Sequence, residues 1–123
     1  MSPLKPASAC PMDRLLRLLT GPWTTYILWV LRTQGPTRFG ELKRRVPGVS
    51  AKMLTERLRT LEGAGLVSRD YEATIPPKVT YALTKRGHEL DEVMGKLAEI
   101  AIRWETEDKQ RRARKPAELR AAE

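Results

Sequence analysis

Three charged side chains between residues 50 and 60 recur at intervals of four and three, which places them on one face of a helix. They are Lys52, Glu56 and Arg59, and Thr55 flanks them. Lysine and arginine can donate hydrogen bonds to guanine O6 and N7 or to phosphates, and a threonine methyl can contact thymine. The set could therefore contact base edges in double-stranded DNA. An ordinary solvated helix face has the same pattern, so these residues alone do not decide between the two interpretations.

The opposite side of the same segment is apolar. Leu54, Leu58 and Leu61 fall within a sector about 60° wide when each residue advances by about 100°. Ser50 is a good N-cap, so a helix is predicted from about Ala51 to Gly63. A helix that reads DNA needs this division, because one face must pack on a rigid scaffold while the other projects.

Basic residues gather around this helix. Residues 38–60 contain seven basic and two acidic side chains, a net +5 of the formal +8 of the whole chain. A basic excess favours a polyanionic partner, because lysine and arginine displace counterions condensed on phosphates. The candidate contacts to the DNA backbone in this stretch are Arg38, Lys43, Arg44 and Arg45.

The residues ahead of this helix are expected to form three shorter helices. Apolar residues at helical spacing predict helices over residues 12–19 and 23–32. Thr37 can cap a third helix over residues 38–46, and residues 47–49 read Pro-Gly-Val, which indicates a tight turn. These elements would form the scaffold that carries the polar helix face.

After Gly65 the pattern changes to that of short strands. Strands are predicted over residues 66–71 and 79–83, separated by a loop whose prolines cannot continue a ladder. Lys78 ends this loop and would reach the minor groove or its phosphates, although a solvated hairpin lysine has the same sequence signature. Thr84 then caps a long helix to about residue 107.

The order of helices, turn, helix and two strands predicts a winged helix-turn-helix, mainly α with a small β-hairpin wing. Its length suits one domain, which we place at residues 12–107, after a flexible lead of residues 1–11. Residues 108–123 are basic and lack apolar periodicity, so a frayed tail is expected there.

Other functional classes find little support in the composition. The chain has one cysteine, which excludes an intrachain disulfide, and one histidine, His88, which lies among charged residues. There is no metal-spaced cluster or phosphate-binding glycine loop, so we expect no enzymatic activity and no cofactor. There is also no apolar run of roughly 18 to 20 residues and no signal core, which favours a bacterial cytoplasmic protein without a membrane partner.

Short motifs occur in a fixed order along most of the chain. They are Cys10-Pro11, Gly21-Pro22-Trp23, Arg38-Phe39-Gly40-Glu41-Leu42, Pro47-Gly48-Val49-Ser50, Met53-Leu54-Thr55, Leu58-Arg59-Thr60-Leu61-Glu62, Gly65-Leu66-Val67, Pro76-Pro77-Lys78-Val79-Thr80-Tyr81, Leu83-Thr84 and Gly87. This series resembles the HxlR-type regulators, a winged-helix group related to the MarR-type repressors. Gly40 departs from the larger polar residue usual in that family, which weakens the third helix locally.

The resemblance implies a homodimeric transcriptional regulator that binds an inverted repeat in DNA. The recognition positions would be Ser50, Lys52, Met53, Thr55, Glu56 and Arg59. Dimerisation in the family uses the N-terminal region and the last helix, which here indicates Leu15, Leu18, Leu19, Leu97, Ile100, Ala101 and Trp104. Packing within the monomer is the alternative for these residues.

Cys10 occupies the position at which several members of that family carry a redox- or electrophile-sensing thiol. A thiolate is the reactive form, and the positive charge of Arg14 lies close in sequence. A plain N-terminal cysteine without a sensing role is the alternative.

For the whole chain, the competing function is nonspecific nucleic-acid binding or protein contact, and no small-molecule effector is indicated.

Overall fold

The computed structural model describes the backbone of residues 10–122 and the side chains of residues 10–115. The flexible lead expected for residues 1–11 lies largely outside the described residues. The chain divides into two compact units, of which one ends at Glu89 and the other begins at Leu90.

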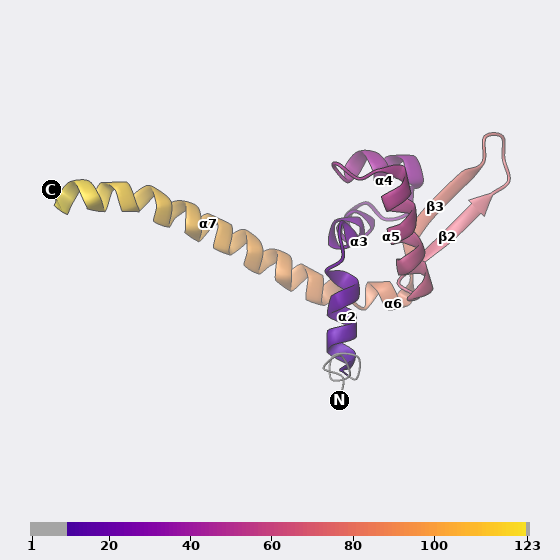
Figure 1. The fold of residues 1–123 in the computed structure, drawn as a ribbon, viewed down its shortest axis with the longest axis horizontal. Helices are drawn as coiled ribbons and strands as arrows, with labels where there is room; N and C mark the ends of the chain where they lie inside the picture. The colour runs from indigo at the N-terminus through magenta and orange to yellow at the C-terminus, as the bar shows by residue number, and fades with distance from the viewer. Residues whose placement is uncertain (1–9, 123) are drawn as a thin grey trace, which may run out of the picture. The chain divides into compact units, whose positions relative to one another are not determined.

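The first unit contains five α-helices and three strands within its described residues (Figure 1). In chain order they are α2 (Pro11–Leu19), α3 (Thr24–Gln34), β1 (Thr37–Arg38), α4 (Phe39–Arg45), α5 (Ala51–Gly63), β2 (Val67–Glu72), β3 (Lys78–Leu83) and α6 (Lys85–His88). This order confirms the predicted winged helix-turn-helix, in which α4 and α5 form the helix-turn-helix and β2 and β3 form the wing.

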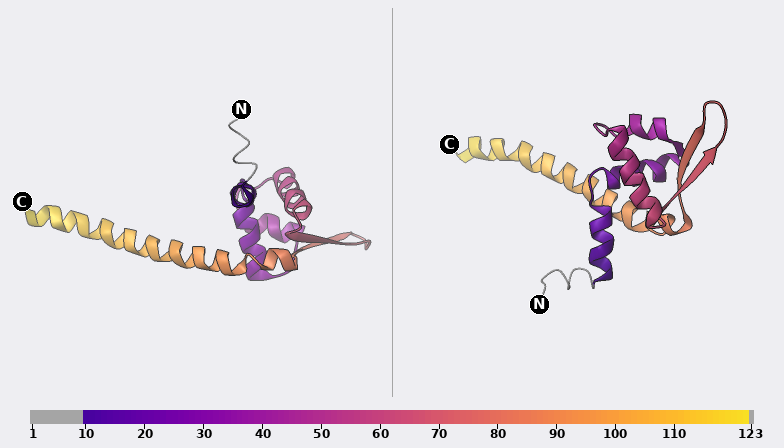
Figure 2. Two further views of the ribbon diagram at one scale, coloured as in Figure 1. Left: turned by 90° about the horizontal axis from the view of Figure 1, so that it is seen from below. Right: turned by 45° about the vertical axis from the view of Figure 1, so that its right-hand side comes forward.

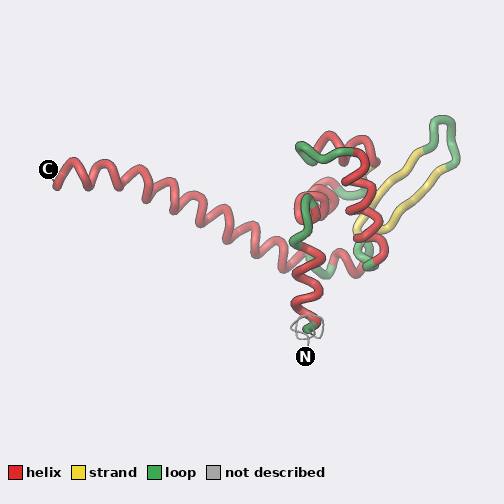
Figure 3. The backbone as a smooth tube through the Cα atoms, viewed as in Figure 1, coloured by secondary structure: helices red, strands yellow, loops and turns green. Residues whose placement is uncertain are grey.

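The sheet has three antiparallel strands in the order β1-β3-β2, one more than the predicted hairpin. Its two longer strands, β2 and β3, run side by side in Figure 3. Thr37 pairs with Tyr81 and Arg38 pairs with Thr80, so these residues are strand rather than a helix cap and the first residue of a helix. The Thr37 hydroxyl donates to the Gly35 carbonyl at 2.7 Å and does not cap the next helix. The third helix therefore begins at Phe39, because strand pairing holds the preceding backbone extended.

One apolar core lies between the helices and the sheet. Side chains from α3, α4 and α5 fill it, together with residues at the start of β2 and near the end of β3. Those with almost no exposed surface are Ile27, Leu28, Leu31, Leu42, Val46, Leu54, Leu58, Leu61 and Val67. The core fixes the orientation of α5, because the three buried leucines of this helix place one whole helix face in the core.

The ends of α5 follow the sequence prediction. The backbone N–H of Met53 donates to the Ser50 hydroxyl at 3.1 Å, which satisfies one of the donors left free at a helix start. Gly65, just past the other end, has φ +79°, a conformation that glycine adopts without strain. The predicted span Ala51–Gly63 is confirmed.

The helix predicted to begin after Thr84 is instead two helices. Thr84 caps only the short α6, accepting from the Gly87 N–H at 3.0 Å. Gly87 lies against the backbone of Leu66, where an added Cβ would be 2.2 Å from the carbonyl oxygen. α6 is thus held against the start of the wing, and a new helix, α7 (Asp91–Ala122), begins after a turn at Glu89 and Leu90.

α7 continues well past residue 107, where the sequence predicted that the helix would end and a frayed tail would begin. Ion pairs one turn apart support the extension, including Lys109 Nζ to Glu105 Oε1 at 3.0 Å and Arg111 Nη2 to Asp108 Oδ1 at 2.8 Å. Lysine, arginine, glutamine and alanine are also strong helix formers. Ion pairs and high helix propensity therefore stabilise this part of α7, in which apolar residues do not recur at helical spacing.

Candidate nucleic-acid interface

The exposed face of α5 carries the predicted recognition residues. Lys52, Glu56 and Arg59 are exposed and lie opposite the buried leucines, and Ser50 at the cap is also exposed. Met53 and Thr55 are half-buried at the edges of this face. The Thr55 hydroxyl donates to the Ala51 carbonyl at 2.8 Å, which leaves its methyl group and oxygen lone pairs for an outside partner.

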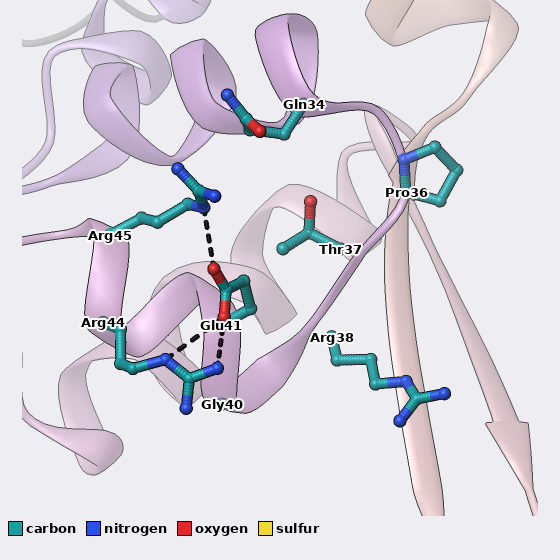
Figure 4. A pocket seen from close by; sticks show the side chains of 8 residues that line it. All are labelled: Gln34, Pro36, Thr37, Arg38, Gly40, Glu41, Arg44 and Arg45. Atoms are coloured by element: carbon teal, nitrogen blue, oxygen red, sulfur yellow. Dashed lines mark hydrogen bonds and ion pairs between the residues drawn. The ribbon is translucent and has the colours of Figure 1, made fainter.

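In α4, two of the arginines predicted to contact the DNA backbone form ion pairs with a single carboxylate (Figure 4). Arg44 Nε donates to Glu41 Oε2 at 3.1 Å, and Arg45 Nε donates to Glu41 Oε1 at 3.0 Å. Hydrogen bonding and charge from Arg44, with a smaller contribution from Arg45, lower the pKa of Glu41 from its ordinary value of 4.5. The Arg38 side chain points away from this carboxylate, and Lys43 is exposed.

These ion pairs change what is expected of α4. The sequence suggested three adjacent bases free to contact phosphate, whereas the structure compensates two of them with Glu41. Exposed pairs of this kind contribute little to stability, because water screens them and two long side chains must be ordered. A phosphate could therefore compete with Glu41 for either guanidinium.

The wing has two chemically different faces. Directly paired residues in an antiparallel ladder project to the same side of the sheet, and Lys78 pairs with Glu72. Asp70 lies two residues from Glu72 and projects to that side as well. Lys78, the predicted wing contact, thus shares its face with two carboxylates.

The other face of the wing carries Arg69 and Tyr71, which pair with Tyr81 and Val79. Arg69 is exposed, and its guanidinium carbon lies 5.5 Å from the centre of the Tyr71 ring. A hollow opens between this face and α5, lined by Phe39, Thr55, Arg59, Glu62, Arg69, Val79 and Tyr81. Sequence reasoning missed Arg69, although its spacing of two from buried Val67 would have placed it on the helix-facing side.

The residues predicted for dimerisation and redox sensing are accessible in the single chain. Of the seven apolar dimer residues, Leu15, Leu97, Ala101 and Trp104 are exposed, and Leu18, Leu19 and Ile100 are half-buried. Cys10 is exposed at the N-cap position of α2 and its side chain makes no capping hydrogen bond. Each of these side chains is therefore open to a partner or reagent.

Among the described residues, no three or more histidine, cysteine, aspartate or glutamate side chains gather where they could hold a metal ion. None of the described helices is both long enough and apolar enough to span a membrane.

Known proteins resemble most of this chain. The HxlR-like helix-turn-helix family matches residues 18–109. The regulatory protein MalR of Fusobacterium mortiferum is 39% identical over 85 residues, which cover 69% of this chain and 80% of MalR.

Solved structures agree with that assignment. The reduced form of the transcriptional regulator YodB from Bacillus subtilis superposes with a TM-score of 0.67 at 39% identity, covering 75% of this chain and 90% of YodB. The redox regulator HypR in its reduced form gives a TM-score of 0.68 at 33% identity, covering 73% of this chain and 88% of HypR. The chain therefore belongs to the HxlR-like helix-turn-helix family of DNA-binding transcriptional regulators.

Proposed function

We propose that this protein acts as a homodimer that binds an inverted-repeat operator sequence-specifically and so regulates transcription. The observation that carries the proposal is the exposed face of α5, where Lys52, Glu56 and Arg59 lie opposite three fully buried leucines. A helix anchored in this way can enter the major groove without losing its packing on the core.

The contacts divide into base reading and backbone binding. Lys52 and Arg59 would donate to guanine, Glu56 would accept from the cytosine amino group, and the Thr55 methyl would contact thymine. Ser50 and Met53 lie at the start of the same helix and would contact the adjoining backbone. Arg38, Lys43, Arg44, Arg45 and Lys78 would supply phosphate contacts, which fix the register of the protein on DNA.

Dimerisation would use α2 and α7. Leu97, Ile100, Ala101 and Trp104 recur at helical spacing on α7, and Trp104 is 59% exposed in the single chain. Contact between water and this apolar stripe is unfavourable. Burial of the stripe against a second copy of the chain would therefore stabilise a dimer. A twofold dimer would place two α5 helices about one DNA turn apart, which an inverted repeat matches.

A footprint on the DNA upstream of the gene, with excess nonspecific competitor, tests the proposal. We expect protection over about two helical turns with twofold symmetry. The double substitution Lys52→Ala and Arg59→Ala should remove this protection while the protein remains folded, because both side chains are exposed. Binding that competitor abolishes at every upstream and genomic fragment would instead support nonspecific nucleic-acid binding or protein contact.

We further propose that Cys10 makes DNA binding responsive to oxidants. Support comes from its exposure and from the redox regulator HypR and diamide-treated YodB among the similar structures. Diamide would accept two protons and two electrons from the Cys10 thiols of two subunits, which would join as a disulfide. DNA affinity of the wild type should change on diamide treatment, and that of Cys10→Ser should not. An equal response of both proteins would overturn the sensor.

A further inference from the structure

The hollow between α5 and the wing brings together two arginines from different elements. Arg59 projects from the recognition helix and Arg69 from β2, which lies beside α5 (Figure 2). Both line the same concave surface, together with Thr55 and the ring of Tyr81. Two consecutive elements, α5 and β2, thus place two guanidinium groups around one space.

Neither guanidinium is neutralised by the protein. Among the described residues, Arg59 and Arg69 have no carboxylate within ion-pair distance, unlike Arg44 and Arg45 on α4. Glu62 is the carboxylate among the residues lining the hollow, and it forms no ion pair with either arginine. The hollow therefore carries two unpaired positive charges against one negative charge.

The position of Arg69 is partly set before any ligand binds. Its guanidinium lies 5.5 Å from the centre of the Tyr71 ring, on the wing face that looks toward α5. A guanidinium above an aromatic ring is attracted by the ring electrons and loses rotational freedom. Less side-chain entropy is then lost when the group binds an anion, and its planar donors match two oxygens of a phosphate.

We propose that Arg59 and Arg69 together hold one phosphate of the DNA backbone in this hollow, and that Arg69 is the principal phosphate contact of the wing. This inference rests on the proposed DNA-binding function. Lys78 is the less favourable candidate, because Glu72 and Asp70 on its own face would repel an approaching phosphate. Backbone phosphates are the anions that reach a rim beside a helix inserted in the major groove.

The test measures binding of the full-length protein to two labelled duplexes, the protected operator and a scrambled sequence, across a range of salt concentrations. Arg69→Ala should weaken binding to both duplexes by roughly five- to twentyfold, since a phosphate contact carries no sequence information. The negative slope of log affinity against log salt should become less steep by about 0.9 for each subunit, because one phosphate contact is lost. Lys78→Ala should have a smaller effect on both quantities.

Three further variants separate this contact from unrelated effects. Lys85→Ala removes the same charge from an exposed position on α6, outside the helix-turn-helix, the wing and the proposed dimer helices, and should leave affinity within about twofold of wild type. Arg69→Lys should restore part of the affinity, because it returns the charge without the paired donors. Glu62→Gln should strengthen binding, since it removes the negative charge at the rim of the hollow.

The outcomes are distinguishable. Unchanged affinity and salt slope in Arg69→Ala, or a larger loss in Lys78→Ala, would overturn the inference while leaving the proposed function intact. A loss confined to the operator, with an unchanged salt slope, would mean that Arg69 contacts a base, which also overturns it. Failure of the wild type to bind any duplex at low salt would overturn the DNA-binding function itself. Thermal melting of each variant confirms that it is folded.

Discussion

The winged-helix unit and α7 both carry apolar residues at helical spacing, yet they use them differently. In residues 10–89, leucines such as Leu54 and Leu58 have almost no exposed surface. Along the described side chains of α7, residues 91–115, none is buried, and Leu97 is 61% exposed. Leucine side chains therefore stabilise the fold in residues 10–89, whereas on α7 they remain available to a second molecule.

The contrast assigns stability and assembly to different parts of the chain. Substitutions in the core should lower the free energy of unfolding of each monomer. Substitutions on α7 should instead weaken the association between monomers. α2 is intermediate, because it contacts α3 but contains no buried residue.

The largest effect is expected from a core leucine. Leu58→Ala should lower the free energy of unfolding by about 2 to 5 kcal/mol, because it removes buried methyl groups and leaves a cavity. Chemical denaturation at low protein concentration measures this. The matched variant Leu97→Ala should change the same quantity by less than about 0.5 kcal/mol. Equal losses in the two variants would contradict the division between core and assembly surface.

The next effect concerns association. Trp104→Asp should raise the dimer dissociation constant by about tenfold or more, because a charge would enter an apolar interface. Sedimentation equilibrium over a range of concentrations measures this constant. Thr106→Asp, on a neighbouring exposed position, controls for the added charge. A wild-type protein that remains monomeric at high concentration would refute the assignment of α7.

A smaller effect is expected where the recognition helix begins. Ser50→Ala removes the acceptor for the Met53 N–H and should lower the free energy of unfolding by about 1 kcal/mol. Ser50→Asp restores an acceptor and should recover most of that loss. If alanine and aspartate behave alike in thermal unfolding, the cap is not what stabilises this end of α5.

The smallest effect concerns pH. The pKa of Glu41 is lowered in the folded state, so its stabilising effect is complete above the ordinary value of 4.5 and is lost as pH falls through the folded-state pKa. The stability difference between the wild type and Glu41→Gln should therefore shrink between about pH 6 and about pH 3. Denaturation curves at several pH values measure it, and a constant difference would contradict the assigned ion pairs.

Local signals predicted α5 well. Ser50, the leucine face and Gly65 after the helix all act within a few residues, and together they predict its bounds and its two faces. The same pattern indicated which side chains would be exposed for recognition. The structure confirms that exposure for Lys52, Glu56 and Arg59.

Features that depend on distant partners could not be predicted in the same way. β1 exists because Thr37 and Arg38 pair with a strand about forty residues later, and no local pattern indicates that pairing. The break between α6 and α7 depends on the approach of Gly87 to Leu66. The hollow beside Arg69 likewise requires α5 and the wing to be packed together before it can be seen.

The most direct test of the central claim compares three duplexes in one binding assay: the intact inverted repeat, the repeat with one half scrambled, and a fully scrambled sequence. A sequence-specific dimer should bind the intact repeat at least about a thousandfold more tightly than the scrambled duplex, with the half-scrambled duplex between them. Equal affinity for all three at the same salt concentration would contradict a regulator that reads DNA through α5.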